Sequence, residues 1–285
     1  MNRKKIGYIV IILLLILLYI LLRRNQIEHF ENNNENVDIF IKTYHKDFIW
    51  LEYCIKSIKK FCKGFRDLVI VSDDDGHEVP ENIKNIMPLK IFYEKVPTNI
   101  NFMDNVGYNW QQYVKLNWIK YTDADIVFVF DSDYMLTHDI TPNDFKINNK
   151  YYWIYRGWDT AGAAQCWKES TDKILGLNTI NETMVAPCFV FTRNTTNKFH
   201  EFINNKYKIN NFWEMILEKK IGKFSEFNIF GNFIYYIYDN EYEKIMLNDS
   251  KHLPNHLPNH RIIQSLSWGG LDEKEKKRRE EILNK

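Results

Sequence analysis

One apolar run constrains the fold of this chain more than any other segment. Asp125–Phe130 reads DIVFVF, and apolar residues follow one another without interruption after the aspartate. A strand of this kind is buried on both faces, as in a parallel sheet that helices cover on both sides. Strand-like runs also occur at Val37–Thr43, Asp67–Ser72 and Pro88–Tyr93, and the apolar residues of Asp47–Cys62 have helical spacing. The sequence therefore predicts an α/β fold with a largely parallel sheet.

The remaining segments extend this pattern. Gly107–Tyr121 has helical spacing, and a further strand is predicted at Ala186–Thr192. Three more helices are predicted at Thr196–Lys206, Asn211–Lys220 and Ser225–Tyr238. The final segment, Asp272–Lys285, is charged and has no sustained apolar stripe, which predicts a solvated surface helix.

The N-terminal segment is apolar enough to enter a membrane. Ile6–Leu22 is interrupted only by a glycine and two tyrosines, and as a helix it would reach roughly 26 Å at about 1.5 Å per residue. Arg23 and Arg24 follow it, and no small-residue cleavage site is present. We therefore predict an uncleaved transmembrane anchor, with a cleaved signal peptide or a buried core helix as alternatives.

These features divide the chain into four parts. Residues 1–24 form a cytosolic stub and the anchor, 25–36 a polar stem, 37–270 a large folded domain, and 271–285 the charged helix. The basic bias before the anchor predicts a single-pass, type II protein of the endoplasmic reticulum or Golgi, or of a viral or host membrane. The four cysteines lack metal-binding spacing, so both disulfides and buried free thiols remain open.

The charge balance argues against nucleic acid as a partner. The chain has 38 basic and 37 acidic residues, for a net charge of +1. Five bases and no acid fall in residues 1–24, so the remainder holds 33 bases against 37 acids, a net charge of −4. A mildly acidic folded domain has no general attraction for DNA or RNA.

The chemistry is expected directly after the DIVFVF strand, at Asp131-Ser132-Asp133. In an open α/β sheet, ligands bind beyond the carboxyl ends of the strands. Two carboxylates one residue apart can share a divalent cation and its bound diphosphate, and oxygen ligands suit Mn²⁺ or Mg²⁺. The alternative is a loop with two solvated acids.

With these residues the chain resembles nucleotide-sugar glycosyltransferases of the GT-A fold, which have a Rossmann-like mixed sheet. It is most similar to a glycosyltransferase-like group with a QQ..K helix, a D-x-D turn and an SE...YG helix. The resemblance spans roughly residues 37–250, with a phenylalanine where the last motif has a tyrosine. The matching residues are Gln111, Gln112 and Lys115, then Asp131 and Asp133, then Ser225, Glu226, Phe230 and Gly231.

The resemblance implies a nucleotide-binding edge. Thr43 and Tyr44 would contact the nucleoside, and Asp73 and Asp74 would accept hydrogen bonds from the base or ribose. Lys115 would neutralise the diphosphate or pair with Asp131. Gln112 and Ser132 would complete the donor site, since at most one of the two neighbouring glutamines is expected to reach it.

The resemblance also implies catalytic and metal-binding residues. Glu226 would contact the acceptor or act as general base, although Ser225-Glu226 also fits a helix N-terminus with Ser225 as the cap. Asp159 is an alternative base, and Trp158 would form a platform under a sugar ring. His260 would be a third metal ligand beside Asp131 and Asp133, with a proline-interrupted loop as the alternative.

We therefore expect a metal-dependent transfer of a sugar from a nucleotide diphosphate sugar to a hydroxyl group of a glycan, protein or lipid. Two other functions stay open. An apolar strand before Asp-x-Asp also marks haloacid dehalogenase-type phosphatases, in which Asp131 would be the nucleophile. Against this, Met135 stands where threonine or valine is expected, and the motif lies mid-chain. The other function is a non-catalytic, membrane-tethered binding module.

Overall fold

The computed structural model describes residues 35–98, 100–238, 240–247, 257–265 and 270–284. The chain divides into two compact units, residues 1–35 and Asn36–Lys285, and the description below concerns the second. The predicted anchor and nearly all of the predicted stem lie outside the described residues. Within the described ranges, every helix is too short or too polar to cross a bilayer.

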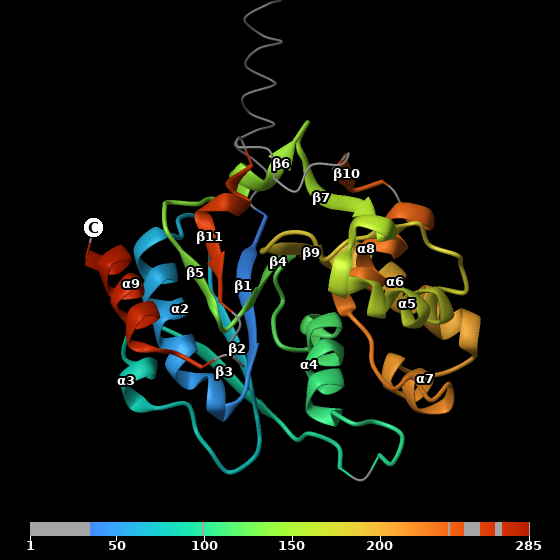
Figure 1. The fold of residues 1–285 in the computed structure, drawn as a ribbon, viewed down its shortest axis with the longest axis horizontal. Coiled ribbons are helices and arrows are strands. Elements are labelled where there is room, and N and C mark those ends of the chain that lie inside the picture. Colours follow the sequence, from blue (N-terminus) through green and yellow to red (C-terminus); the bar gives the residue numbers. More distant parts are fainter. Residues whose placement is uncertain (1–34, 99, 239, 248–256, 266–269, 285) are drawn as a thin grey trace, which may run out of the picture. The chain divides into compact units, whose positions relative to one another are not determined.

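A five-stranded sheet in the order β3-β2-β1-β4-β9 forms the centre of this unit (Figure 1). The first four strands are mutually parallel, and only β9 runs antiparallel to its neighbour. The predicted α/β fold with a largely parallel sheet is thus confirmed. The strands are β1 (Val37–Thr43), β2 (Leu68–Asp73), β3 (Lys90–Glu94), β4 (Ile126–Asp131) and β9 (Phe189–Thr192).

Helices cover the two faces of this sheet. On one side lie α2 (Phe48–Phe61), α9 (Glu273–Asn284) and the short α3 (Glu81–Lys84), and on the other lies α4 (Val106–Leu116) (Figure 1). Every residue of β1 and the whole apolar run of β4 are buried, as the DIVFVF pattern predicts for strands covered on both faces.

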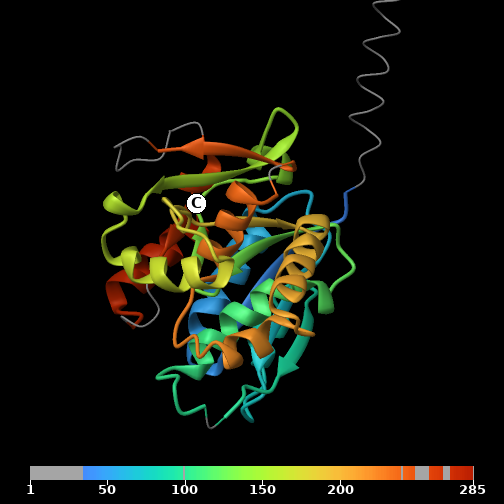
Figure 2. The same ribbon diagram turned by 90° about the vertical axis from the view of Figure 1, so that its right-hand side faces the viewer.

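A second layer of strands and helices adjoins β9, as the turned view in Figure 2 shows. Its sheet has the order β10-β7-β6, and β8 also pairs with β7. A separate pair, β5 with β11, lies beside α2 (Figure 1). These strands are β5 (Tyr134–Leu136), β6 (Lys146–Ile147), β7 (Lys150–Gly157), β8 (Asn181–Glu182), β10 (Tyr242–Met246) and β11 (Ile262–Gln264). The helices are α5 (Lys168–Leu175), α6 (Arg193–Tyr207), α7 (Phe212–Glu218) and α8 (Glu226–Tyr236). Short 3-10 turns are η1 (His45–Asp47), η2 (Trp118–Lys120), η3 (Pro142–Phe145), η4 (Trp158–Thr160), η5 (Gly162–Trp167) and η6 (Pro258–Arg261).

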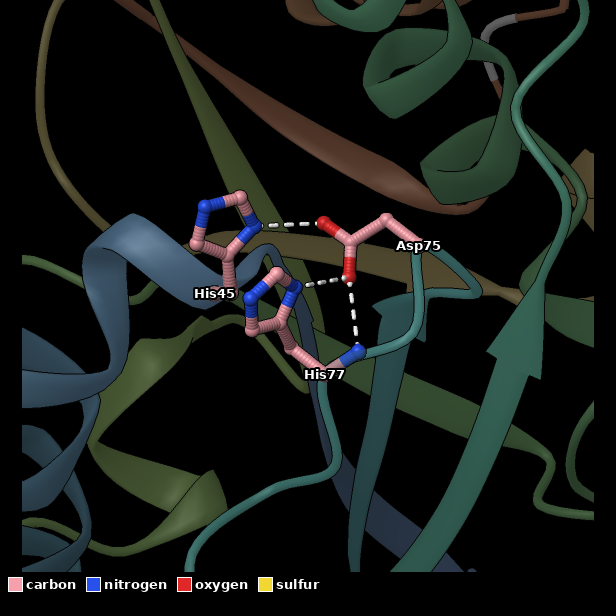
Figure 3. Close-up of side chains that lie close together, drawn as sticks. All are labelled: His45, Asp75 and His77. Atoms are coloured by element: carbon pink, nitrogen blue, oxygen red, sulfur yellow. Dashed lines mark hydrogen bonds and ion pairs between the residues drawn. The ribbon is translucent and has the colours of Figure 1, made fainter.

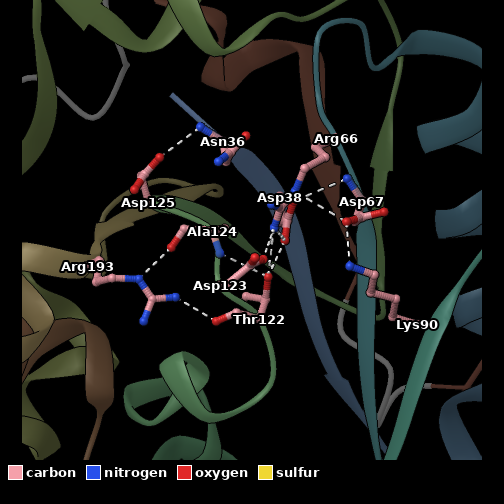
Figure 4. A network of polar contacts seen from close by, with 10 residues as sticks. All are labelled: Asn36, Asp38, Arg66, Asp67, Lys90, Thr122, Asp123, Ala124, Asp125 and Arg193. Carbon is pink, nitrogen blue, oxygen red and sulfur yellow. Dashed lines mark hydrogen bonds and ion pairs between the residues drawn. The ribbon is translucent and has the colours of Figure 1, made fainter. Parts of the chain in front are cut away.

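A buried carboxylate ties the amino ends of the central strands together (Figure 4). Asp38 is fully buried, and the Arg66 guanidinium donates to both of its oxygens at 2.9 Å. The Thr122 hydroxyl donates to Asp38 Oδ2 at 2.5 Å, and Arg66 also reaches the exposed Asp123 at 2.7 Å. This network joins segments next to β1, β2 and β4, at the edge opposite to the predicted site.

The charged C-terminal helix lies on the surface, as its sequence predicts, but one of its arginines is buried. α9 packs on α2, and Arg279 is only 1% exposed. Its guanidinium lies 4.6 Å from the Trp50 ring and donates to the carbonyl oxygen of Asp133 at 3.0 Å. Arg279 is the only buried residue in the described range of α9, so the helix is a surface element as predicted, and this one side chain anchors it.

The four cysteines are free thiols, with Cys54 and Cys188 buried, Cys62 half-buried and Cys166 exposed. Burial raises the pKa of the Cys54 and Cys62 thiols, so both stay protonated at neutral pH. Of the two alternatives left open by the sequence, the structure has free thiols.

Candidate active site at the carboxyl edge of the sheet

The candidate site lies where the strand order of the central sheet reverses. From β1 the chain passes to β2 and β3 on one side, whereas β4 pairs with the other side of β1. A crevice opens at such a switch point, outside the carboxyl ends of the two central strands. Lys42 of β1 and Asp131 of β4 are register partners at this position. Sheet topology therefore places a ligand site next to the predicted Asp-x-Asp turn.

Lys115 links two of the predicted site residues. Its side chain is 2% exposed, and its Nζ donates to Asp131 Oδ1 at 2.5 Å and to Glu226 Oε1 at 2.8 Å. The Nζ also lies 4.8 Å from the centre of the Phe227 ring. α4, β4 and α8 thus each contribute one charged group to a buried cluster of one lysine and two carboxylates.

The start of α8 holds Glu226 in this cluster. Ser225 caps the helix, since its hydroxyl accepts from the backbone N–H of Asn228 at 3.3 Å, and Glu226 is the first helical residue. Ser225 therefore caps the helix and Glu226 lies in the cluster, so the two interpretations of this segment are compatible. The amide of buried Gln112, oriented with its nitrogen toward Glu226, donates to the same carboxylate.

Burial shapes the electrostatics of the cluster. It raises the pKa of Glu226, and the nearby charge of Asp131 adds to this effect while Lys115 opposes it. Burial alone would lower the pKa of Lys115, but the charges of Asp131 and Glu226 outweigh it and hold that pKa above its usual range. Lys115 therefore stays a cation, whereas Glu226 holds its proton more tightly than an ordinary glutamate does.

A second lysine occupies the ends of β1 and β2. Lys42 is 2% exposed and its Nζ donates to Asp73, the last residue of β2, and to the Thr43 carbonyl oxygen at 2.6 Å. Burial lowers the pKa of Lys42, although Asp73 opposes this. Tyr44 is half-buried, and Asp74 is exposed with its backbone N–H bonded to the Glu94 carbonyl oxygen at 2.9 Å.

The Asp131–Asp133 turn is fixed from two directions. The Ser132 hydroxyl donates to Asp47 Oδ2 at 3.2 Å, and the Asp133 carbonyl oxygen accepts from Arg279. Asp131 has 19% of its side chain exposed at the crevice, whereas Asp133 is 7% exposed. Both offer carboxylate oxygens, the ligands that Mn²⁺ and Mg²⁺ prefer, so the donor set fits the expected ion.

Two predicted residues are not brought into this cluster. Asp159 is exposed on η4, and no hydrogen bond or ion pair joins it to Lys115 or Glu226 within the described ranges. His260 is exposed on η6, and its Nδ1 contacts the Leu257 carbonyl oxygen. In the described part of the chain, its ligand atoms do not lie within 4.8 Å of those of Asp131 and Asp133, because Pro258 opens a turn that engages the imidazole locally.

A family model described as a family of unknown function (DUF6492) matches residues 35–267. The chain belongs to this family. Among curated proteins, none has significant sequence similarity to it. Two solved structures that resemble it are of the galactosyltransferase LgtC, one in complex with donor and acceptor sugar analogs, the other an active-site mutant. They are 12% and 11% identical, and each covers 87% of this chain and 95% of LgtC with a TM-score of 0.48. A likeness this distant assigns no activity to the DUF6492 chain.

Several residues around the DUF6492 site escaped prediction. Lys42 lies inside an otherwise apolar strand, and an isolated lysine in a buried strand is the one signal that marks it. Arg279 gave no signal, because it stands in a run of charges.

An aromatic pair beside the site was also missed. Tyr108 stacks on Trp167 with ring centres 5.6 Å apart, and Lys223 Nζ lies 4.5 Å from the Trp167 ring. Burial raises the pKa of Tyr108, and the charges of Glu226 and Asp131 raise it further. Trp158, the predicted sugar platform, is instead buried in a small cluster with Trp167.

Proposed function

We propose that this DUF6492 protein is a metal-dependent glycosyltransferase of the GT-A fold, which transfers a sugar from a nucleotide diphosphate sugar to an acceptor hydroxyl. The observation that carries the proposal is Lys115, buried between Asp131 and Glu226 at the switch point of the sheet. A lysine and two carboxylates are costly to bury together, and active sites are where such clusters concentrate. The order of the QQ..K, D-x-D and SE motifs supports the same function.

The donor would bind along the carboxyl ends of β1, β2 and β4. Thr43, Tyr44, Asp73 and Asp74 would face the nucleoside, and Gln112, Lys115 and Ser132 would support the donor site from the crevice. Asp131 and Asp133 would hold Mn²⁺ or Mg²⁺, which when bound stabilises the charge that develops on the departing diphosphate. Lys115 holds the Asp131 carboxylate in place through the ion pair at 2.5 Å, and a metal ligand of this kind binds in its ionised form.

The acceptor would approach Glu226. Its raised pKa lies closer to neutral pH than that of an ordinary glutamate, which suits a general base that removes the proton of the attacking hydroxyl. Asp159 stays the second candidate base, and the variants below separate the two.

The cellular setting is part of the proposal. Residues 6–22 would anchor the chain in a membrane of the endoplasmic reticulum or Golgi, or in a viral or host membrane, as a type II protein with its large domain (37–270) in the lumen. Release from membranes by detergent, and not by high salt, would support this. Release by salt alone would contradict it.

The decisive experiment is a panel of nucleotide sugars tested for Mn²⁺-dependent release of nucleotide diphosphate. Parent protein should turn over one donor, and Asp133→Asn should lower the rate by about 100-fold or more, as loss of a group that stabilises transition-state charge does. Glu226→Gln should cost a similar factor, whereas Asp159→Asn should leave the rate within about twofold. The reverse order for Glu226 and Asp159 would reassign the base.

Other outcomes of this panel would favour the two remaining functions. Release of inorganic phosphate from aryl phosphates, with loss of activity in Asp131→Asn, would identify a phosphatase. Absence of turnover for every donor, with a partner bound equally by parent and Asp133→Asn protein, would identify a binding module.

A further inference from the structure

A second group of metal-ligating side chains lies at the ends of β1 and β2, away from the Asp-x-Asp residues in the sequence. His45 opens η1 directly after β1, and Asp75 and His77 lie in the turn that follows β2. β1 and β2 are parallel neighbours, with Thr43 paired to Ser72 at their ends. The sheet therefore brings the three side chains together although 30 residues separate His45 from Asp75.

Both imidazoles point the same nitrogen at one carboxylate (Figure 3). His45 Nδ1 lies 2.5 Å from Asp75 Oδ2, and His77 Nδ1 lies 3.1 Å from Asp75 Oδ1. The ligand atoms of the three residues all fall within 4.8 Å of one another. The two rings stack with centres 4.2 Å apart and planes 20° apart, so that both Nε2 atoms face away from Asp75.

A backbone hydrogen bond orients the Asp75 carboxylate, and the three side chains remain accessible to solvent. The backbone N–H of His77 donates to Asp75 Oδ1 at 3.1 Å and so orients the carboxylate. The side chains of His45, Asp75 and His77 are 33%, 30% and 58% exposed, which leaves room for water or a small ligand. Between the last two, Gly76 has a φ of +87°, and nothing lies within 4 Å of a side chain there, so the turn can adjust around an ion.

We propose that His45, Asp75 and His77 form a site for a transition metal ion of the zinc class, with the fourth position open to water or a small ligand. Two imidazole nitrogens and one carboxylate oxygen are a donor set of zinc proteins, whereas an all-carboxylate pair such as Asp131 and Asp133 suits Mn²⁺ or Mg²⁺. In the metal-bound site each neutral imidazole would bind the ion through Nδ1 and carry its one proton on the outward Nε2.

An ion bound at this site would cross-link two loops. The ion would join the start of η1 to the turn after β2, next to Asp73 and Tyr44 at the same sheet edge. The inference does not depend on the proposed glycosyltransferase activity, since it concerns different ligands and is tested without any substrate.

The test is titration of the full chain, purified in detergent without a polyhistidine tag, with Zn²⁺ alone by calorimetry. One equivalent should bind, and the affinity should fall by more than about tenfold in His45→Ala, His77→Ala and Asp75→Asn. His138→Ala, which removes another exposed histidine, should bind as the parent does. Unchanged melting temperatures in the absence of metal would show that the variants fold.

Co²⁺ gives an independent readout, since a tetrahedral site with two imidazoles has visible absorption that an all-carboxylate site in octahedral geometry lacks. The absorption should appear with one equivalent of Co²⁺ in the parent and in Asp133→Asn, and disappear in His77→Ala. Zinc affinity that is unaffected by His45→Ala and His77→Ala, or absence of stoichiometric binding, would overturn the inference. In either case the nucleotide-sugar panel would still decide the proposed function separately.

Discussion

Glu226 is the residue whose environment differs most from that expected of its type, because a carboxyl group at a helix start is ordinarily solvated. Here it is 1% exposed and shares Lys115 with Asp131. Removing Lys115 would leave two carboxylates in the cluster without their cation, so the three side chains act as a unit. Sequence reasoning named each of them, but only the fold shows that one lysine serves both acids.

The raised pKa of Glu226 predicts how stability depends on pH. The folded protein keeps this proton at pH values where the unfolded chain, with a glutamate pKa of 4.5, has released it. The free energy of unfolding therefore falls as pH rises from 4.5 through the raised pKa. Glu226→Gln removes this titration, so the difference in unfolding free energy, parent minus variant, should decrease as pH rises above 4.5. Urea unfolding across that range measures it, and a constant difference would contradict the raised pKa.

At the scale of single elements, α8 depends on one position without a side chain. A Cβ at Gly231 would lie 2.6 Å from Trp153 Nε1 and 2.6 Å from Thr183 Cβ, so the helix packs directly against the second layer of strands. Gly231→Ala should lower the free energy of unfolding by about 3 kcal/mol. In α4, a Cβ at Gly107 would meet only Asn105 Oδ1, at 3.7 Å, so Gly107→Ala should raise it by up to about 1 kcal/mol. If chemical denaturation gave the same change in unfolding free energy for Gly231→Ala and Gly107→Ala, α8 would be able to shift away from Trp153 and Thr183 to make room for the methyl group.

α9 connects to the site through its one buried side chain. Arg279→Ala removes the donor to the Asp133 carbonyl oxygen and the contact with Trp50, which should cost about 2–4 kcal/mol of stability. If Asp131 and Asp133 hold the ion, the loosened turn should also weaken Mn²⁺ binding, measured by titration. The adjacent Arg278 is 53% exposed, and Arg278→Ala should change either quantity little. If the Arg279→Ala protein bound Mn²⁺ with normal affinity, Arg279 would contribute to stability and not to ion binding.

At the scale of the whole molecule, the amino edge of the sheet holds the central strands and the carboxyl edge holds the candidate chemistry. Asp38→Asn should lower the free energy of unfolding by about 3–5 kcal/mol, since it breaks a buried pair and leaves Arg66 without its main partner. Asp123 contacts the same arginine but is 85% exposed, so Asp123→Asn should cost less than about 1 kcal/mol. Denaturant unfolding measures the free energy of unfolding of the two variants. Similar losses in both would mean that the contact of Arg66 with Asp38 stabilises the fold no more than its contact with Asp123.

The central strands were predictable because β1, β2 and β4 are each dominated by a run of apolar residues. The predicted strand at Val37–Thr43 coincides with β1, and DIVFVF overlaps β4 except at its ends. β7 escaped because KYYWIYRG mixes aromatic with charged residues, and only its pairing with β10 and β6 buries the aromatic rings. β5 and β11 are three residues each, too short for periodicity to show.

The site residues that belong to sequence motifs could be predicted. The residues that reach the site from distant segments of the chain could not. Lys115, Asp131 and Glu226 follow from their motifs, and the structure joins them. Nothing local to residue 279 indicates that it reaches the turn after β4. The pairing of His45 with Asp75 depends likewise on which strands are neighbours, and sequence spacing does not contain that information.

The contact between Arg279 and Asp133 spans 146 residues of chain, and this separation has a consequence for biosynthesis. A nascent polypeptide that has already emerged as far as β4 can pair its first strands, since β1 pairs with β2 and β4 and all three have then been translated. The arginine that steadies the turn is translated much later. Ribosome-bound or prematurely terminated products would therefore pair these strands before the Asp131–Asp133 turn is secured, and that turn would become fixed only when the last helix has been synthesised.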